Sequence, residues 1–75
     1  MNLQETIIGK IAQAKAIKQA MSFDMPREIF KAMNNHWDNL IDEAMELNKN
    51  SDSNNWRVNI ELINDVINTQ IVEKY

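Results

Sequence analysis

The chain has 75 residues, a net charge of −3 at pH 7, one glycine, one proline and no cysteine. A chain of this length forms at most one domain, and its core is marginal because small chains bury a smaller share of their surface. The absence of cysteine excludes disulfides and thiolate metal sites, and the scarcity of glycine and proline disfavours strand-rich folds, which need many turns. We therefore expect a few long helices, stabilised by helix packing or by oligomerisation.

Hydropathy gives no sign of a membrane or export segment. Apolar runs cover only two or three residues, which is too short for a transmembrane span. The first ten residues, MNLQETIIGK, lack the basic and apolar regions of a signal peptide. We expect a cytoplasmic protein with no membrane partner. Asn and Ile are common and have AT-rich codons, which suggests an AT-rich source genome such as that of a phage or a low-GC bacterium.

Charge is distributed unevenly along the chain. Residues 1–31 carry five basic and three acidic side chains, whereas residues 32–75 carry three basic and eight acidic ones. The basic residues of the first helix (Lys10, Lys15 and Lys18) do not share one face, and no aromatic residue lies among them. This is a poor surface for phosphate or for single-stranded bases. The acidic half of the chain would repel nucleic acid or steer a basic partner.

The first segment is predicted as a helix over residues 2–21. Asn2 can cap its N-terminus, with Glu5 at capping-box spacing. One apolar stripe recurs at helical spacing (Leu3, Ile7, Ile11, Ala14, Ile17 and Met21), and a second row follows at four-residue intervals (Ile8, Ala12, Ala16 and Ala20). In the connection that follows, we expect Phe23 and Met25 to plug the end of the bundle.

The second helix is predicted over residues 26–48. Its apolar seam alternates gaps of three and four residues (Phe30, Met33, Trp37, Leu40, Ala44 and Leu47), as in left-handed helix packing. Asp38, Asp42 and Glu46 lie on the opposite face, toward water. The helix is expected to end in the polar loop NKNSDSNN of residues 48–55, whose small polar side chains have nothing to bury.

The third segment, residues 55–74, has two interpretations. Residues 56–62 alternate apolar and polar side chains, which is typical of a strand, here one that would need another chain as its partner. Helical spacing explains the whole segment, with an inner face of Trp56, Ile60, Ile63, Ile67 and Ile71. We therefore predict a helix. A second apolar row beside that face (Val58, Leu62 and Val66) exceeds what one small core requires.

These elements predict an all-α fold, a single domain over residues 1–75 arranged as an antiparallel three-helix bundle. Short connections make neighbouring helices run antiparallel. Because the first and third helices each have two apolar rows, and because two tryptophans also need cover, we expect the bundle to self-associate as a homodimer.

No catalytic or cofactor chemistry is expected. His36 is the one histidine and has no nucleophile or orienting carboxylate at a suitable spacing, so it is expected at the boundary of the apolar seam. The carboxylates of the second helix point to water rather than into a bundle interior, so we expect no metal site. The chain also lacks a glycine-rich phosphate loop, and we expect no cofactor and no enzymatic activity.

The function hypothesis is a protein-interaction module, a small regulator or inhibitor that covers the surface of a partner protein, such as a phage protein that blocks a host complex. Its predicted contact residues are the acidic face of the second helix and the apolar surplus of the third: Asp38, Asp42, Glu46, Trp56, Val58, Leu62 and Val66. The alternative is a nucleic-acid-linked regulator, acting through the weak basic face of the first helix or by acidic mimicry of DNA. The sequence does not identify the partner.

Overall fold

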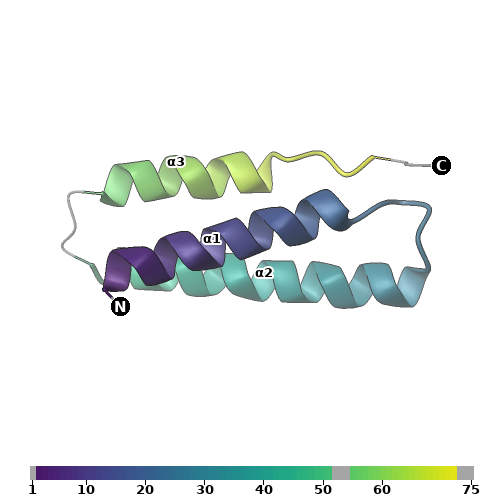
Figure 1. Cartoon of the computed structure of the whole chain (residues 1–75), viewed down its shortest axis with the longest axis horizontal. Helices are drawn as coiled ribbons and strands as arrows, with labels where there is room; N and C mark the ends of the chain where they lie inside the picture. Colours follow the sequence, from purple (N-terminus) through teal and green to yellow (C-terminus); the bar gives the residue numbers. More distant parts are fainter. Residues whose placement is uncertain (1, 52–54, 73–75) are drawn as a thin grey trace.

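The computed structural model describes residues 2–51 and 55–72. It contains three helices, one in each of the three segments whose apolar residues recur at helical spacing. Within that part of the chain, α1 (Leu3–Ala20), α2 (Arg27–Lys49) and α3 (Trp56–Ile67) pack together, so the predicted all-α three-helix bundle is confirmed. Figure 1 shows them side by side along the longest axis of a molecule of 43 × 18 × 17 Å. Not one of these helices is long and apolar enough to cross a membrane.

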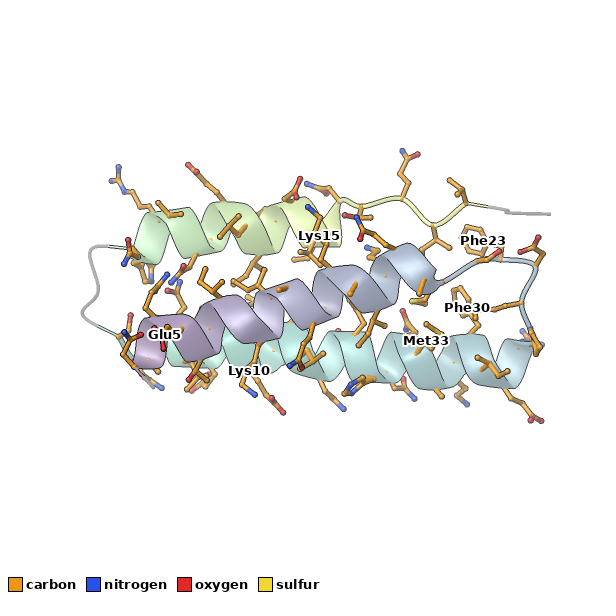
Figure 2. All side chains as sticks on the ribbon, in the orientation of Figure 1. Glu5, Lys10, Lys15, Phe23, Phe30 and Met33 are labelled. Atoms are coloured by element: carbon orange, nitrogen blue, oxygen red, sulfur yellow. The ribbon has the colours of Figure 1, made fainter. Side chains whose placement is uncertain are left out.

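The N-terminal cap of α1 forms as predicted. Asn2 Oδ1 accepts a hydrogen bond from the Glu5 backbone N–H at 2.8 Å, which satisfies one of the free donors of the first turn. The helix ends at Ala20, and its C-cap residue Met21 is buried. Phe23 does not plug the bundle end, contrary to expectation. It is exposed and stacks on Phe30 of α2, with 5.7 Å between ring centroids (Figure 2).

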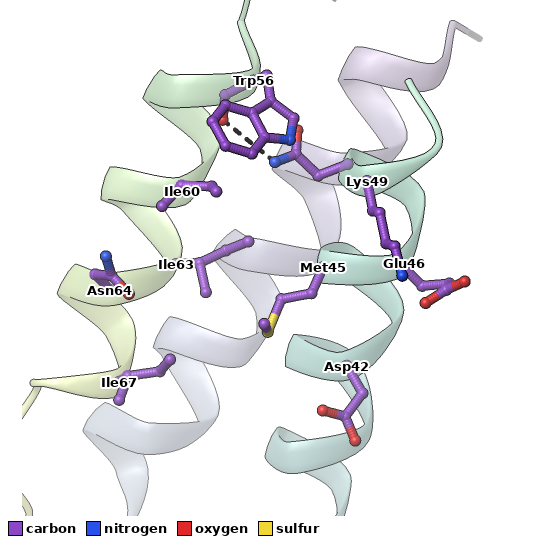
Figure 3. A pocket seen from close by; sticks show the side chains of 10 residues that line it. Asp42, Met45, Glu46, Lys49, Trp56, Ile60, Ile63, Asn64 and Ile67 are labelled. Carbon is purple, nitrogen blue, oxygen red and sulfur yellow. Dashed lines mark hydrogen bonds between the residues drawn. The ribbon is translucent and has the colours of Figure 1, made fainter. Parts of the chain in front are cut away.

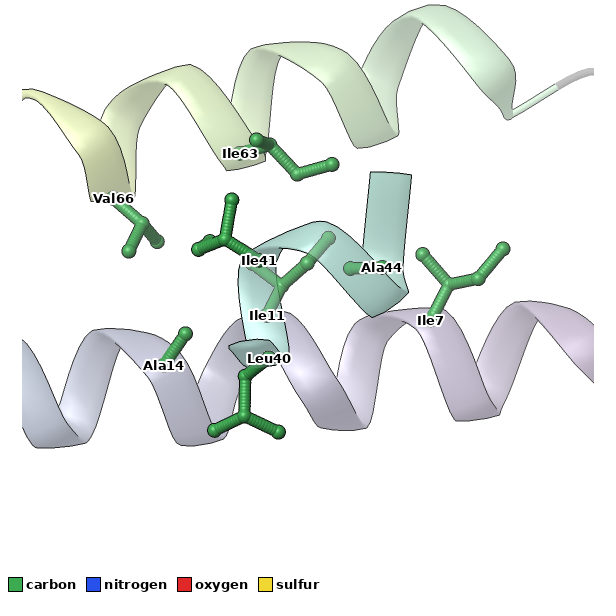
Figure 4. Close-up of a cluster of buried hydrophobic side chains, with 8 residues drawn as sticks. All are labelled: Ile7, Ile11, Ala14, Leu40, Ile41, Ala44, Ile63 and Val66. Carbon is green, nitrogen blue, oxygen red and sulfur yellow. The ribbon is translucent and has the colours of Figure 1, made fainter. Parts of the chain in front are cut away.

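The core lies where α1, α2 and α3 meet, and Figure 4 shows its side chains converging between the three ribbons. It comprises eight buried residues: Ile7, Ile11, Ala14, Leu40, Ile41, Ala44, Ile63 and Val66. Ile17, Trp37 and Leu47 pack partly buried against it. The stripe predicted for α1, except the exposed Leu3, and the middle of the seam predicted for α2 therefore face inward. The alanines leave room for close approach of the helices, while the isoleucines supply most of the buried apolar area.

The third segment is a helix from Trp56 onward, so the strand interpretation is wrong. The helix ends at Ile67, well before the predicted end at residue 74; residues 73–75 lie outside the described part of the chain. Polar groups satisfy its last carbonyls: Thr69 Oγ1 donates to Asp65 O at 3.0 Å, and Lys18 Nζ donates to Ile67 O at 2.6 Å. The residues that follow Ile67 are rich in Asn, Thr and β-branched side chains, which have low helix propensity.

The inner face of α3 is rotated from the predicted one. Its buried residues are Asn59, Ile63 and Val66, whereas Trp56 and Ile67 are exposed. Val66, predicted as a partner contact, is instead a core residue with 1% of its surface exposed. α2 ends at Lys49, one residue beyond its predicted end at residue 48, so the predicted loop over residues 48–55 begins later than expected, and Asn48 is buried. The rotation of α3 has a physical cause in a set of buried amides described below.

Candidate interaction site

Three side-chain amides, one from each helix, form a hydrogen-bonded network at the end of the bundle where α2 finishes and α3 begins. Asn59 Nδ2 donates to Gln4 Oε1 and to Asn48 Oδ1, both at 2.9 Å, and Gln4 Nε2 donates back to Asn59 Oδ1 at 2.9 Å. Asn48 Nδ2 in turn donates to the backbone oxygen of Trp56 at 3.2 Å. Asn59 is 0% exposed and Asn48 is 2% exposed, so the bond between them is buried, whereas the bonds to Gln4 and to the Trp56 backbone are partly buried.

The network sets the rotation of α3 about its own axis. Buried amides that lose their partners cost free energy, so Asn59 must face Gln4 and Asn48 for its polar atoms to be satisfied. With Asn59 inward, the positions that follow it at helical spacing, Ile63 and Val66, also turn inward. Trp56 and Ile60 then lie on the side of α3 that faces α2.

An open apolar groove results between α2 and α3. Its volume is about 470 Å³, and Figure 3 shows its side chains projecting from both helices, with α1 behind. The lining residues are Asp42, Met45, Glu46, Asn48, Lys49, Trp56, Ile60, Ile63, Asn64 and Ile67. Met45, Trp56 and Ile67 are 49%, 45% and 42% exposed, so large apolar side chains on both walls meet solvent.

The α2 wall of the groove is acidic. Asp42 and Glu46 lie one turn apart and line it together with a single cation, Lys49. Among the described residues, neither carboxylate has an ion-pair partner within 4 Å. Two other carboxylates are paired: Glu43 pairs with Lys10 at 2.6 Å, and Asp65 pairs with Lys15 at 3.3 Å. The α2 wall of the groove therefore carries two carboxylates without an ion pair and one lysine, which gives it a net negative charge.

The predicted contact residues separate onto different faces. Asp42, Glu46 and Trp56 come together at the groove, which we call the α2/α3 groove. Asp38 is exposed on α2, one turn before Asp42, and is not among the lining residues. Val58 and Leu62 are exposed but lie on the other side of α3, where Leu62 joins Ile8 in a smaller hollow of about 180 Å³ against α1. The ion pair between Lys15 and Asp65 lies at this second hollow.

The lysines of α1 are all engaged with other helices. Lys10 and Lys15 make the ion pairs just described, on α2 and α3 respectively. The Lys18 ammonium lies 4.4 Å from the ring centroid of Trp37 and also donates to the end of α3. Partial burial lowers the pKa of Lys18 from its ordinary value, because it disfavours the charged form. Because of these contacts, the three lysines of the predicted basic face lie at three separate positions.

Candidate catalytic and metal-binding side chains are not brought together. His36 is exposed on α2. Over residues 2–51 and 55–72, no group of three or more potential His, Cys, Asp or Glu ligands is placed to hold a metal ion.

Sequence reasoning missed Asn48 and Asn59, together with Met45 and Ile60 as groove residues. A signal for Asn59 was present, because it precedes Ile63 by four residues and Val66 by seven and so occupies an apolar position of a helical stripe. Only its polarity made it look like a surface residue.

No protein-family model, curated protein or solved structure matches the chain, so similarity to known proteins assigns no role to the groove.

Proposed function

We propose that the chain is a non-enzymatic protein-interaction module, a small regulator or inhibitor that binds a partner protein through the α2/α3 groove. The supporting observation is the exposure of Met45, Trp56 and Ile67 around one continuous apolar groove. Scattered exposed apolar residues are ordinary, whereas a contiguous apolar surface with a polar rim is typical of a contact site. Trp is also enriched among residues that dominate binding energy at interfaces.

The amide network makes such a groove a stable feature of the surface. Its hydrogen bonds link the helices near Trp56, so that the backbone of Trp56 is held beside α2 before any partner arrives. A preformed contact surface loses less conformational entropy on binding than one that must first be ordered. We expect binding to change the fold of the bundle little.

Self-association is a second part of the proposal and uses the opposite side of α3. Val58 and Leu62 are exposed there, and Leu62 lines a hollow together with the exposed Ile8 of α1. A second copy of the chain would cover this row, as the surplus of apolar residues predicts. Light scattering at two protein concentrations tests it. We expect the measured mass of the wild type to double at the higher concentration and that of Leu62→Glu to stay at the monomer value. A monomer at both concentrations for the wild type would refute the dimer.

The nucleic-acid alternative stays a prediction that these contacts do not favour. Each lysine of α1 already has an intramolecular partner, and the groove is lined by unpaired carboxylates. Binding to nonspecific DNA with a steep dependence on salt would support the alternative and count against the interaction module.

The interaction module is tested by affinity capture from extracts of the source cells, followed by reconstitution with the purified partner. The test variant is Met45→Glu, which places a charge in the α2/α3 groove. The control is Ile29→Glu, which makes the same kind of change at an exposed position of α2 outside the groove. A partner that binds the wild type and the control, and loses affinity at least about tenfold for the groove variant, is expected.

Two results would overturn the proposal. One is that no protein binds the wild-type chain reproducibly after reconstitution. The other is a partner that binds the Met45→Glu and Ile29→Glu variants equally well, since the contact would then lie elsewhere. Circular dichroism of both variants checks that each remains folded.

A further inference from the structure

We infer that the α2/α3 groove receives a basic amphipathic α-helix of the partner protein. The partner helix would pack its apolar face on the groove floor and pair its cationic side chains with Asp42 and Glu46. This inference rests on the proposed function and adds the chemistry of the partner.

The shape of the groove fits a helix. α1 packs against one side of the pair formed by α2 and α3, and the groove lies on their other side, as Figure 3 shows. Its α3 wall extends from Trp56 to Ile67, which corresponds to about 17 Å at the helical rise, or about three turns of a docked helix. Two adjacent helices present ridges and grooves between which a further helix can pack. A partner helix there would complete a four-helix arrangement.

The surface chemistry of the groove fits the apolar face of such a helix. Trp56, Ile60 and Ile67 on one wall face Met45 on the other. An apolar stripe at spacings of three and four residues would meet this row of side chains. Met45 is unbranched and half exposed, so its side chain can adjust to the shape of the incoming residue.

The groove is lined by two carboxylates, Asp42 and Glu46, against one cation, Lys49, so its net negative charge favours a basic helix over an acidic one. Asp42 and Glu46 are four residues apart, and Asp38 continues the same row by one turn. A helix lying along α2 can offer Lys or Arg at the same four-residue spacing. The α3 wall adds no charge opposite them, because its polar lining residue there is the amide Asn64. Complementary charge of this kind sets orientation and speeds association.

A second copy of this chain fits the groove less well. In a symmetric contact across the groove, each copy would bring its own Asp42 and Glu46 against those of the other, and like charges in contact oppose binding. The basic residues that a copy could offer from α1 are held by Glu43, Asp65 and Ile67 of their own chain.

The experiment uses the full chain and three synthetic helical peptides of about 14 residues, or roughly 21 Å. All three share one Leu-rich stripe, and their polar faces carry Lys, Glu or Gln. Binding is followed by fluorescence anisotropy of a dye on the peptide. The protein variants are Glu46→Lys and its matched control Glu61→Lys, which changes the net charge equally at an exposed position of α3 outside the groove.

We expect the Lys peptide to bind at least about tenfold more tightly than the Glu peptide at low salt, with the difference shrinking as salt rises. Glu46→Lys should reduce that preference several-fold, and Glu61→Lys should leave it unchanged. Equal binding of all three peptides would overturn the basic-helix inference and leave the interaction module in place. Binding of none, with a native partner still captured through Met45, would also overturn the inference alone. A dimer that Met45→Glu dissociates would show that a second copy occupies the groove and would overturn it as well.

Discussion

Replacing Asn59 with leucine tests whether the buried amides hold α3 in its rotation. The Asn59→Leu variant removes three hydrogen bonds, two donated by Nδ2 and one accepted by Oδ1, each 2.9 Å long. Gln4 is only partly buried and can turn toward water, whereas Asn48 is 2% exposed and is left with an unsatisfied oxygen. The leucine side chain recovers part of the loss through its own burial.

The expected cost follows from these contacts. Three neutral hydrogen bonds contribute about 3 kcal/mol in total, and the apolar gain of leucine offsets about 1 kcal/mol of it. We therefore expect the free energy of unfolding to fall by about 2 kcal/mol. A domain of this size has a total of about 4–11 kcal/mol, so the loss is a large fraction of it. The melting temperature should fall by about 8–16 °C.

Thermal and urea unfolding followed by far-UV circular dichroism measure the effect, at one fixed protein concentration because self-association would shift the midpoint. Asn39→Leu is the control, since Asn39 is exposed on α2 and its replacement should change stability by less than about 0.5 kcal/mol.

A double-mutant cycle makes the test specific to the network. Asn48→Leu should also destabilise the chain, but the double variant Asn48→Leu/Asn59→Leu should cost at least about 1 kcal/mol less than the two single changes together, because it leaves no buried asparagine facing an apolar side chain. Additive effects, or an Asn59→Leu variant as stable as the wild type, would refute the argument that these amides fix α3.

The other predictions concern the core and the contacts of Lys18. Val66→Ala should lower the free energy of unfolding by about 2 kcal/mol, whereas Val58→Ala, at an exposed position of the same helix, should change it by less than about 0.5 kcal/mol in the same urea series. Lys18→Met should cost about 1 kcal/mol through the loss of the contact with Trp37 and of the hydrogen bond to Ile67 O, and an unchanged midpoint would contradict this. In an NMR titration, the pKa of Lys18 should lie below the ordinary lysine value. Since the folded state then binds this proton more weakly than the unfolded state, its contribution to stability should rise as pH increases through the lowered pKa.

Part of the candidate site followed from the sequence. Asp42, Glu46 and Trp56 were predicted as contact residues and do meet at the α2/α3 groove. Their prediction needed only the position of each residue on its own helix. Val66 was placed wrongly, because it belongs to an apolar row beside the predicted inner face of α3 that looked like surplus. Val66 is in the core, whereas Val58 and Leu62 of the same row are exposed.

Local spacing by itself determined the three helices, the cap at Asn2 and most of the inner faces of α1 and α2, because these depend on residues within a turn or two of one another. The tertiary structure decided which side of α3 faces inward. That choice depends on Gln4 and Asn59, which are 55 positions apart in the chain and exchange two hydrogen bonds. By its residue type, an asparagine is assigned to the surface. It becomes an interior residue only when other helices bring partners for its amide, and that pairing turned Trp56 out of the core and opened the groove beside α2.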